Sequence, residues 1–142
     1  MKNEAGGLKV LIIDDEPEAA NLVKFILTRE CSDEVYIGAS ASEGPNIARQ
    51  ERPDLIIVRI MMYEMNGYEV CRRLKAVPQL QGLPVLLQAA MDPKRVYPEA
   101  QRVGAAGYLR QPFHPQELIA ARDAVLRGGV YYPPLSEENT GQ

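Results

Sequence analysis

The chain has 142 residues, of which 46% are hydrophobic and 25% charged, and its formal net charge is -3. This balance is typical of one folded globular domain and excludes an intrinsically disordered chain. The small acidic excess also excludes a broad basic surface for nucleic acid or anionic lipid.

Export and membrane insertion are not expected either. The apolar runs have the length of strands, far short of the roughly 20 residues that cross a bilayer, and the first residues lack the apolar core of a signal peptide. Cys31 and Cys71 lie far apart, with no cysteine or histidine at metal-ligand spacing, so we expect reduced thiols. These features together predict a cytoplasmic protein.

Five short apolar segments predict five strands, at residues 9–13, 34–37, 55–58, 84–87 and 107–109. The first, third and fourth segments are nearly continuous in valine, isoleucine and leucine, which is typical of strands covered on both faces.

The first helix is predicted to begin around Pro17, in an acidic first turn, and to place Leu22, Phe25 and Ile26 on its apolar side. Four further helices follow between the strands and after the last one. We expect their starts near Gly44, at Gly67, in a first turn that contains Pro98, and at Pro115, and we expect the last to end at Gly128.

Strands that alternate with helices predict an α/β fold: a doubly wound parallel sheet with helices on both faces. For five strands the common order is 2-1-3-4-5. The predicted domain covers residues 8–128, after an N-terminal extension at 1–7. Residues 129–142 contain two prolines and many polar residues, so we expect a linker or loose end.

Three charges are predicted to meet at the carboxyl edge of this sheet. Asp14 and Asp15 follow the first strand, and Arg59 ends the third, its neighbour in that order. Two adjacent carboxylates need a counter-charge, often a divalent cation, and a guanidinium fork suits carboxylates bidentately. Our hypothesis is that Arg59 replaces the cation. Alternatively, Arg59 points outward and an aspartate merely caps the first helix.

The segments LIIDDEP, DLIIVRIMMYEMNGYEV, LPVLLQAA and GAAGYLRQPF occur in this order within residues 8–127. With their spacing, they resemble the CheY-like receiver domain of bacterial two-component response regulators. The resemblance implies a flavodoxin-like five-stranded fold. It also implies an acidic pair that holds Mg²⁺, an aspartate that accepts a phosphoryl group at the end of strand three, a hydroxyl residue at the end of strand four, and a lysine before a proline after strand five.

Carried over by position, the acidic pair is Asp14 and Asp15, but the other three roles are lost. The acceptor position holds Arg59, the hydroxyl position Ala89 and the lysine position Gln111. A guanidinium offers no anionic oxygen nucleophile, a methyl group donates no hydrogen bond, and an amide carries no charge.

We therefore predict a pseudo-receiver that is not phosphorylated at the usual position. It would be no enzyme, have no cofactor, and offer Asp14 and Asp15 only as weak metal ligands. Arg110 does not replace the lysine, because alternation along the strand turns it to the opposite face.

Three further residues have a predicted place. Tyr108 matches the family's switch aromatic and is expected to be partly buried in one rotamer, against Val96 or Tyr97. His114 is expected in a loop or at a helix start. Gln88 is expected either to hydrogen-bond within the pocket or to face outward.

The predicted function is signal transduction through protein–protein contacts, with a partner protein or in a homodimer. The family surface for such contacts corresponds to residues 96–102, 108–110 and 118–127. Direct binding to nucleic acid or membrane is not expected. Two alternatives stay open: sensing of an anion or small ligand at the strand carboxyl edge, and the receiver part of a transcriptional regulator whose DNA-binding domain is absent.

Overall fold

The five strands form one parallel sheet in the order β2-β1-β3-β4-β5, which confirms the predicted order. A computed structural model describes residues 7–135 of the chain. The strands are β1 (Lys9–Ile13), β2 (Glu34–Gly38), β3 (Leu55–Arg59), β4 (Val85–Ala89) and β5 (Gly107–Arg110).

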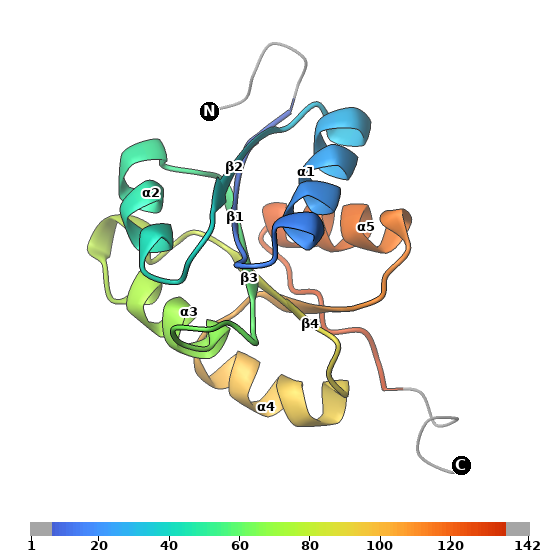
Figure 1. Cartoon of the computed structure of the whole chain (residues 1–142). Coiled ribbons are helices and arrows are strands. Elements are labelled where there is room, and N and C mark those ends of the chain that lie inside the picture. The colour runs from blue at the N-terminus through green and yellow to red at the C-terminus, as the bar shows by residue number, and fades with distance from the viewer. Residues whose placement is uncertain (1–6, 136–142) are drawn as a thin grey trace.

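Helices cover both faces of the sheet, as predicted (Figure 1). On one face lie α1 (Pro17–Cys31) and α5 (Pro115–Leu126). On the other lie α2 (Glu43–Glu51), α3 (Gly67–Lys75) and α4 (Pro93–Arg102), and a 3-10 turn (Pro78–Leu80) precedes β4.

Each central strand contributes to two hydrophobic cores because its side chains alternate between the faces. In β1, Leu11 and Ile13 pack toward α2–α4, whereas Val10 and Ile12 pack toward α1 and α5. All four side chains are fully buried, which explains the unbroken apolar run at this strand.

The predicted apolar side of α1 is partly wrong. Leu22 and Phe25 are 56% and 57% exposed. The buried residues are Ala20, Val23, Ile26 and Leu27. The helix therefore rests on the sheet along a narrow stripe, and large apolar residues outside it stay exposed.

The predicted start of α4 is also wrong. The helix begins at Pro93, and the side chain of Asp92 caps it by accepting a hydrogen bond from the Lys94 N–H (3.0 Å). Pro98 consequently lies inside the helix and not in its first turn. Aspartate followed by proline combines two strong start signals, the N-cap residue and the preferred first helical residue, and these outweigh the later proline.

Residues 130–135 do not form the loose end that was predicted. Tyr131 pairs with Gly107 in a parallel bridge, so the chain returns to the sheet beside β5 after α5 ends. Most of the predicted N-terminal extension and the last seven residues of the tail lie outside the described residues. Among residues 7–135, no helix has the length and apolar character needed to cross a bilayer.

Candidate functional site

Asp14 lies directly after β1, at the carboxyl edge of the sheet, and is 1% exposed. Both of its carboxylate oxygens accept hydrogen bonds. Oδ1 accepts from the Glu16 N–H (2.9 Å), and Oδ2 accepts from Nε2 of Gln88 (3.2 Å). The carboxylate is thus held on both sides by neutral donors.

Burial raises the pKa of the Asp14 carboxyl above its ordinary value, because the protein interior disfavours the charged form. The hydrogen bond from Glu16 and the charge of Arg59 act in the opposite direction without cancelling it. A buried carboxylate whose pKa is still raised is incompletely compensated by its partners.

Asp15 turns toward the loop that follows β3. Its Oδ2 accepts a hydrogen bond from the Tyr63 N–H (2.7 Å), which joins the end of β1 to the β3–α3 loop. Tyr63 itself is 97% exposed, and Met61 beside it is 63% exposed. Met62 and Met65, in contrast, pack against the core. The methionines after β3 are therefore divided between surface and interior.

Arg59, the last residue of β3, reaches Asp14 but forms no bidentate pair with it. Its Nη1 lies 3.8 Å from Oδ1 of Asp14, beyond hydrogen-bonding distance, and its Nε donates to the carbonyl oxygen of Met61 (3.2 Å). The predicted bidentate fork is therefore wrong. The guanidinium is shared between the carboxylate and the loop backbone, and its side chain is 23% exposed.

Two glutamines complete the pocket on the β4–β5 side. Gln88, fully buried, is the register partner of Arg59 in β3–β4 pairing. The Nε2 of Gln88 donates to Asp14, and the Oε1 of Gln88 lies 3.5 Å from the Nε2 of Gln111. Of the two predicted positions of the Gln88 side chain, the structure confirms the one with a hydrogen bond within the pocket. A buried amide inside an otherwise apolar strand was the sequence signal for this role.

Ala89 and Tyr108 lie behind this pocket. Ala89 is 3% exposed and presents only its methyl group where a hydroxyl was expected from the resemblance. Tyr108 is 2% exposed, deeper than predicted. Its hydroxyl lies 2.8 Å from the Ala89 carbonyl and 2.7 Å from that of Met91, and it accepts from the Met91 N–H (3.0 Å). Its ring meets Tyr97 edge-on, as expected.

The residues around β5 agree with two further predictions. Arg110 is exposed, so it does not point into the pocket with Gln111. His114 is the N-cap of α5, and its Nδ1 accepts from the Gln116 N–H (3.2 Å). The peptide bond between Gln111 and Pro112 is cis.

Comparison with known proteins identifies the architecture around this pocket. The sequence model of the response regulator receiver domain matches residues 10–123. The chain belongs to this family.

This receiver domain has curated relatives that include a transcriptional regulatory protein and a DNA-binding response regulator. It is 33% identical over 129 residues to the alkaline phosphatase synthesis transcriptional regulatory protein PhoP of Bacillus subtilis, an alignment that covers 91% of this chain and 52% of that protein. It is 34% identical over 119 residues to the DNA-binding response regulator MtrA of Mycolicibacterium smegmatis, covering 84% of this chain and 50% of MtrA. The chain spans about half the length of these relatives.

Solved structures agree with the fold. The chemotaxis response regulator CheY4 of Vibrio cholerae superposes with a TM-score of 0.78 at 29% identity, over 84% of this chain and 98% of CheY4. A LuxR-family response regulator from Aurantimonas reaches a TM-score of 0.84 over 94% of this chain and 99% of its own, and its 21% identity supports the fold alone.

The pocket of this receiver domain does not fit the Mg²⁺ ion that the family implies. Mg²⁺ requires several oxygen ligands in octahedral geometry. Here one oxygen of Asp14 faces the donor amide of Gln88, the other accepts a backbone N–H, and a guanidinium stands 3.8 Å away. Among residues 7–135, no group of three histidine, cysteine, aspartate or glutamate side chains is placed to hold a metal ion.

Proposed function

We propose that this receiver domain is a pseudo-receiver, which transmits a signal through protein contacts without accepting a phosphoryl group at the end of β3. One observation carries the proposal: the residue at that position is Arg59, whose guanidinium is held between Asp14 and the Met61 carbonyl. Phosphoryl transfer to a side chain needs a nucleophile with a free lone pair, and a guanidinium has none.

The surrounding residues support the same proposal. Ala89 has no hydroxyl with which to bind a phosphoryl oxygen, and Gln111 has no charge with which to neutralise one. The amide of Gln88 reaches Asp14 instead, on the side where a metal ion would need an oxygen. The pocket is organised as a set of internal contacts, and no reaction is expected in it.

For the contact surface we propose the outer sides of α4, β5 and α5, which we call the α4–β5–α5 face. The partner is a protein, or a second copy of this chain. The pocket communicates with this face through Tyr108, whose hydroxyl reaches the Ala89 carbonyl and whose ring meets Tyr97 on α4. In the relatives of twice this length, the named function is transcriptional regulation or DNA binding, so we further propose such a regulator as the context of this domain.

The test is incubation of the chain with Mg²⁺ and acetyl phosphate, followed by intact mass measurement and size-exclusion chromatography. We expect no phosphoryl adduct and no change in elution. Arg59→Asp is the matched variant, since it returns a carboxylate to the same position. An adduct on the unaltered chain would overturn the proposal, and an adduct on the variant alone would show that the missing nucleophile is what blocks the reaction.

The alternative of anion sensing at the strand carboxyl edge has weaker support. Arg59 is partly exposed, but the carboxylate of Asp14 lies beside it and repels an incoming anion. Titration with phosphate or sulfate, followed by calorimetry, tests this reading, and saturable binding that disappears in Arg59→Met would favour it.

A further inference from the structure

The strand β5 lies at the edge of the sheet, and residues 130–135, here called the C-terminal segment, fill that edge. The N–H of Tyr131 donates to the carbonyl of Ala106 (2.8 Å), and the carbonyl of Tyr131 accepts from the N–H of Tyr108 (2.9 Å). An unpaired sheet edge offers such groups to any extended chain. In this molecule the extended chain is its own C-terminal segment.

Gly107 makes this approach possible. A Cβ atom at this position would lie 2.6 Å from the Tyr131 carbonyl oxygen and 2.8 Å from the Tyr131 Cβ, closer than atoms of two side chains or backbones can pack. The backbone of the C-terminal segment therefore lies where a side chain of any other residue would stand. The absence of a side chain at Gly107 therefore allows the backbone of an extended segment to pack closely against the β5 edge.

Two tyrosines anchor the C-terminal segment. The hydroxyl of Tyr132 donates to the Ala105 carbonyl (2.7 Å), and its ring meets that of Tyr97 edge-on, with the centroids 5.0 Å apart. Tyr97, from α4, donates in turn to the Pro133 carbonyl (2.6 Å). Burial raises the pKa of Tyr132 to about 12, in agreement with a hydroxyl removed from water. The anchors thus come from both α4 and the loop before β5.

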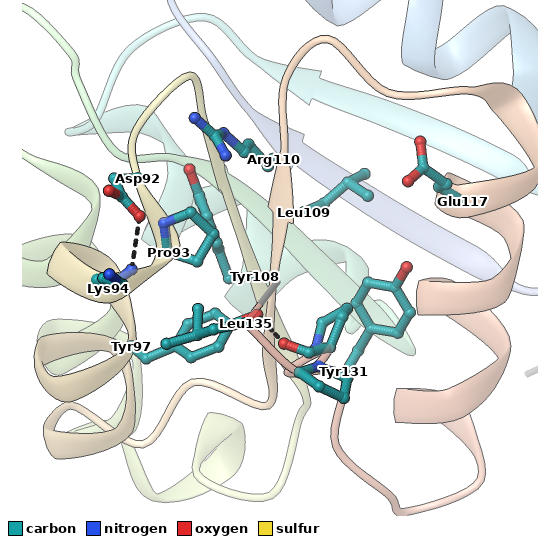
Figure 2. Close-up of a pocket in the computed structure, with 12 residues that line it drawn as sticks. Asp92, Pro93, Lys94, Tyr97, Tyr108, Leu109, Arg110, Glu117, Tyr131 and Leu135 are labelled. Atoms are coloured by element: carbon teal, nitrogen blue, oxygen red, sulfur yellow. Dashed lines mark hydrogen bonds between the residues drawn. The ribbon is translucent and has the colours of Figure 1, made fainter. Parts of the chain in front are cut away.

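The pairing is confined to a short stretch. Pro133 and Pro134 have no N–H, so they cannot extend the ladder along β5. Tyr131, both prolines and Leu135 border a pocket of about 280 Å³ between the segment and α4, β5 and α5 (Figure 2). Gly128, two residues before the segment, adopts a left-handed conformation (φ 86°), and Val130, the first residue of the segment, is 66% exposed. Gly128 and Gly129 end α5 with backbone hydrogen bonds to Val125 and Ala124, so we place the hinge of the segment at the exposed Val130 that follows them.

We propose that the β5 edge is an acceptor site for an extended tyrosine- and proline-containing segment. Residues 130–135 of the same chain fill it as a releasable latch, and the same residues of a second copy fill it when the latch detaches. A second copy fits the site because its segment makes the same hydrogen bonds and anchors, which is the basis of strand exchange. This inference rests on the proposed function only in that the acceptor belongs to the α4–β5–α5 face.

The test uses a fluorescent peptide with the sequence GVYYPPL, residues 129–135, as a stand-in for the segment of a second copy. In the full chain, Tyr132→Ala removes the anchor and leaves the acceptor intact. We expect the peptide to bind this variant at least tenfold more tightly than the unaltered chain, in which the acceptor is filled. Tyr132→Phe loses the hydroxyl alone and should bind the peptide with intermediate affinity. It replaces Tyr132→Ala in the test where that variant is too unstable to use.

The matched controls are two glycine substitutions in the Tyr132→Ala background. Gly107→Ala blocks the acceptor and should reduce peptide binding at least tenfold. Gly82→Ala, where a Cβ meets no atom within 4 Å, should leave it unchanged. Equal binding to the unaltered chain, no binding to either tyrosine variant, or binding that survives Gly107→Ala would each overturn the proposal.

These outcomes are independent of the acetyl phosphate experiment. A phosphoryl adduct on the unaltered chain would overturn the pseudo-receiver and leave the peptide result standing. Failure of the peptide to bind would remove the acceptor and leave the chemistry at Arg59 as proposed.

Discussion

Among residues 7–135, two arginine–aspartate pairs with a fully buried carboxylate have very different geometry. Arg122 in α5 meets Asp33 before β2 through two short hydrogen bonds, Nε to Oδ2 at 2.7 Å and Nη2 to Oδ1 at 2.6 Å. Arg59 and Asp14 have one contact of 3.8 Å. Both aspartate side chains are fully buried, yet the arginines are 11% and 23% exposed.

The difference separates a pair that joins two parts of the fold from a loose contact at the carboxyl edge of the sheet. The bidentate pair joins α5 to the start of β2, and Asp33 also accepts from the Leu8 N–H (2.9 Å), so the carboxylate is fully used in holding the fold. At the carboxyl edge, glutamine and backbone donors hold Asp14, and the guanidinium is only nearby. Proximity of opposite charges is therefore not a measure of how strongly a pair supports the fold.

The largest effect is expected from Arg122→Ala. Removing one partner of a buried, hydrogen-bonded pair leaves an uncompensated charge, and we expect a loss of about 3–5 kcal/mol in the free energy of unfolding by urea. Arg102→Ala is the control, because this arginine pairs with Glu99 at the surface and should cost less than about 1 kcal/mol. Similar losses for the two variants would contradict the structural role of the Arg122 pair.

The second effect tests whether the guanidinium is what excludes a metal. Arg59→Asp brings a third carboxylate to Asp14 and Asp15, and we expect it to destabilise the metal-free domain by about 1–3 kcal/mol. Mg²⁺ at a hundred times its Kd should return about 2.7 kcal/mol, because it binds the folded state alone.

The measurement is urea unfolding with and without Mg²⁺, and the unaltered chain is the reference. It should show no stabilisation by Mg²⁺, since Arg59 repels the ion and Gln88 occupies one oxygen of Asp14. Stabilisation of the unaltered chain by Mg²⁺ would show that the acidic pair still binds metal despite the guanidinium.

A smaller effect is expected from Arg59→Met, which keeps the length of the side chain and removes its charge. The contact with Asp14 is long and the guanidinium partly exposed, so the loss should be about 1 kcal/mol or less. Comparison with Arg122→Ala in the same urea series measures the difference between the two pairs directly. A loss as large as that of Arg122→Ala would mean that Arg59 does hold the pocket together.

The sheet could be predicted because its signal is local. The unbroken apolar runs of β1, β3 and β4 follow from burial on both faces, and the alternation with helices leaves few topologies. The exposure of Phe25 could not be predicted, because the hydrophobic pattern of α1 does not show how many of its apolar side chains contact the sheet. The start of α4 differs from the prediction because the capping pair at Asp92 and Pro93 is a stronger start signal than Pro98, which the helix accommodates in its interior.

At the site, the residue types were predictable and their contacts were not. Position along the strands brings Asp14, Asp15 and Arg59 to one edge, but the distance between charges depends on side-chain conformations and on competing partners. Arg59 had the Met61 carbonyl as a competing partner. The pairing of Tyr131 with β5 was hidden by the prolines after it, which indicate a linker when the tail is considered alone.

The smallest effect is the pH dependence of stability that the buried Asp14 produces. Burial raises the pKa of Asp14 in the folded state, so the folded protein binds this proton more tightly than the unfolded chain does. Ionised Asp14 therefore destabilises the fold above its folded pKa. That cost fades as the pH falls through the folded pKa and disappears below its ordinary pKa near 3.8. Each tenfold difference in proton affinity corresponds to about 1.4 kcal/mol.

Asp14→Asn should therefore be more stable than the unaltered chain at pH 7, and the difference should shrink as the pH is lowered toward 4. The asparagine keeps an oxygen for the Glu16 N–H, and the Gln88 amide can turn to meet its new donor. Urea unfolding at several pH values measures the difference, with Glu30→Gln at the exposed end of α1 as a control that stays within about 0.5 kcal/mol throughout. An Asp14→Asn variant that is less stable at pH 7 would show that Arg59 compensates the buried charge more fully than its 3.8 Å separation implies.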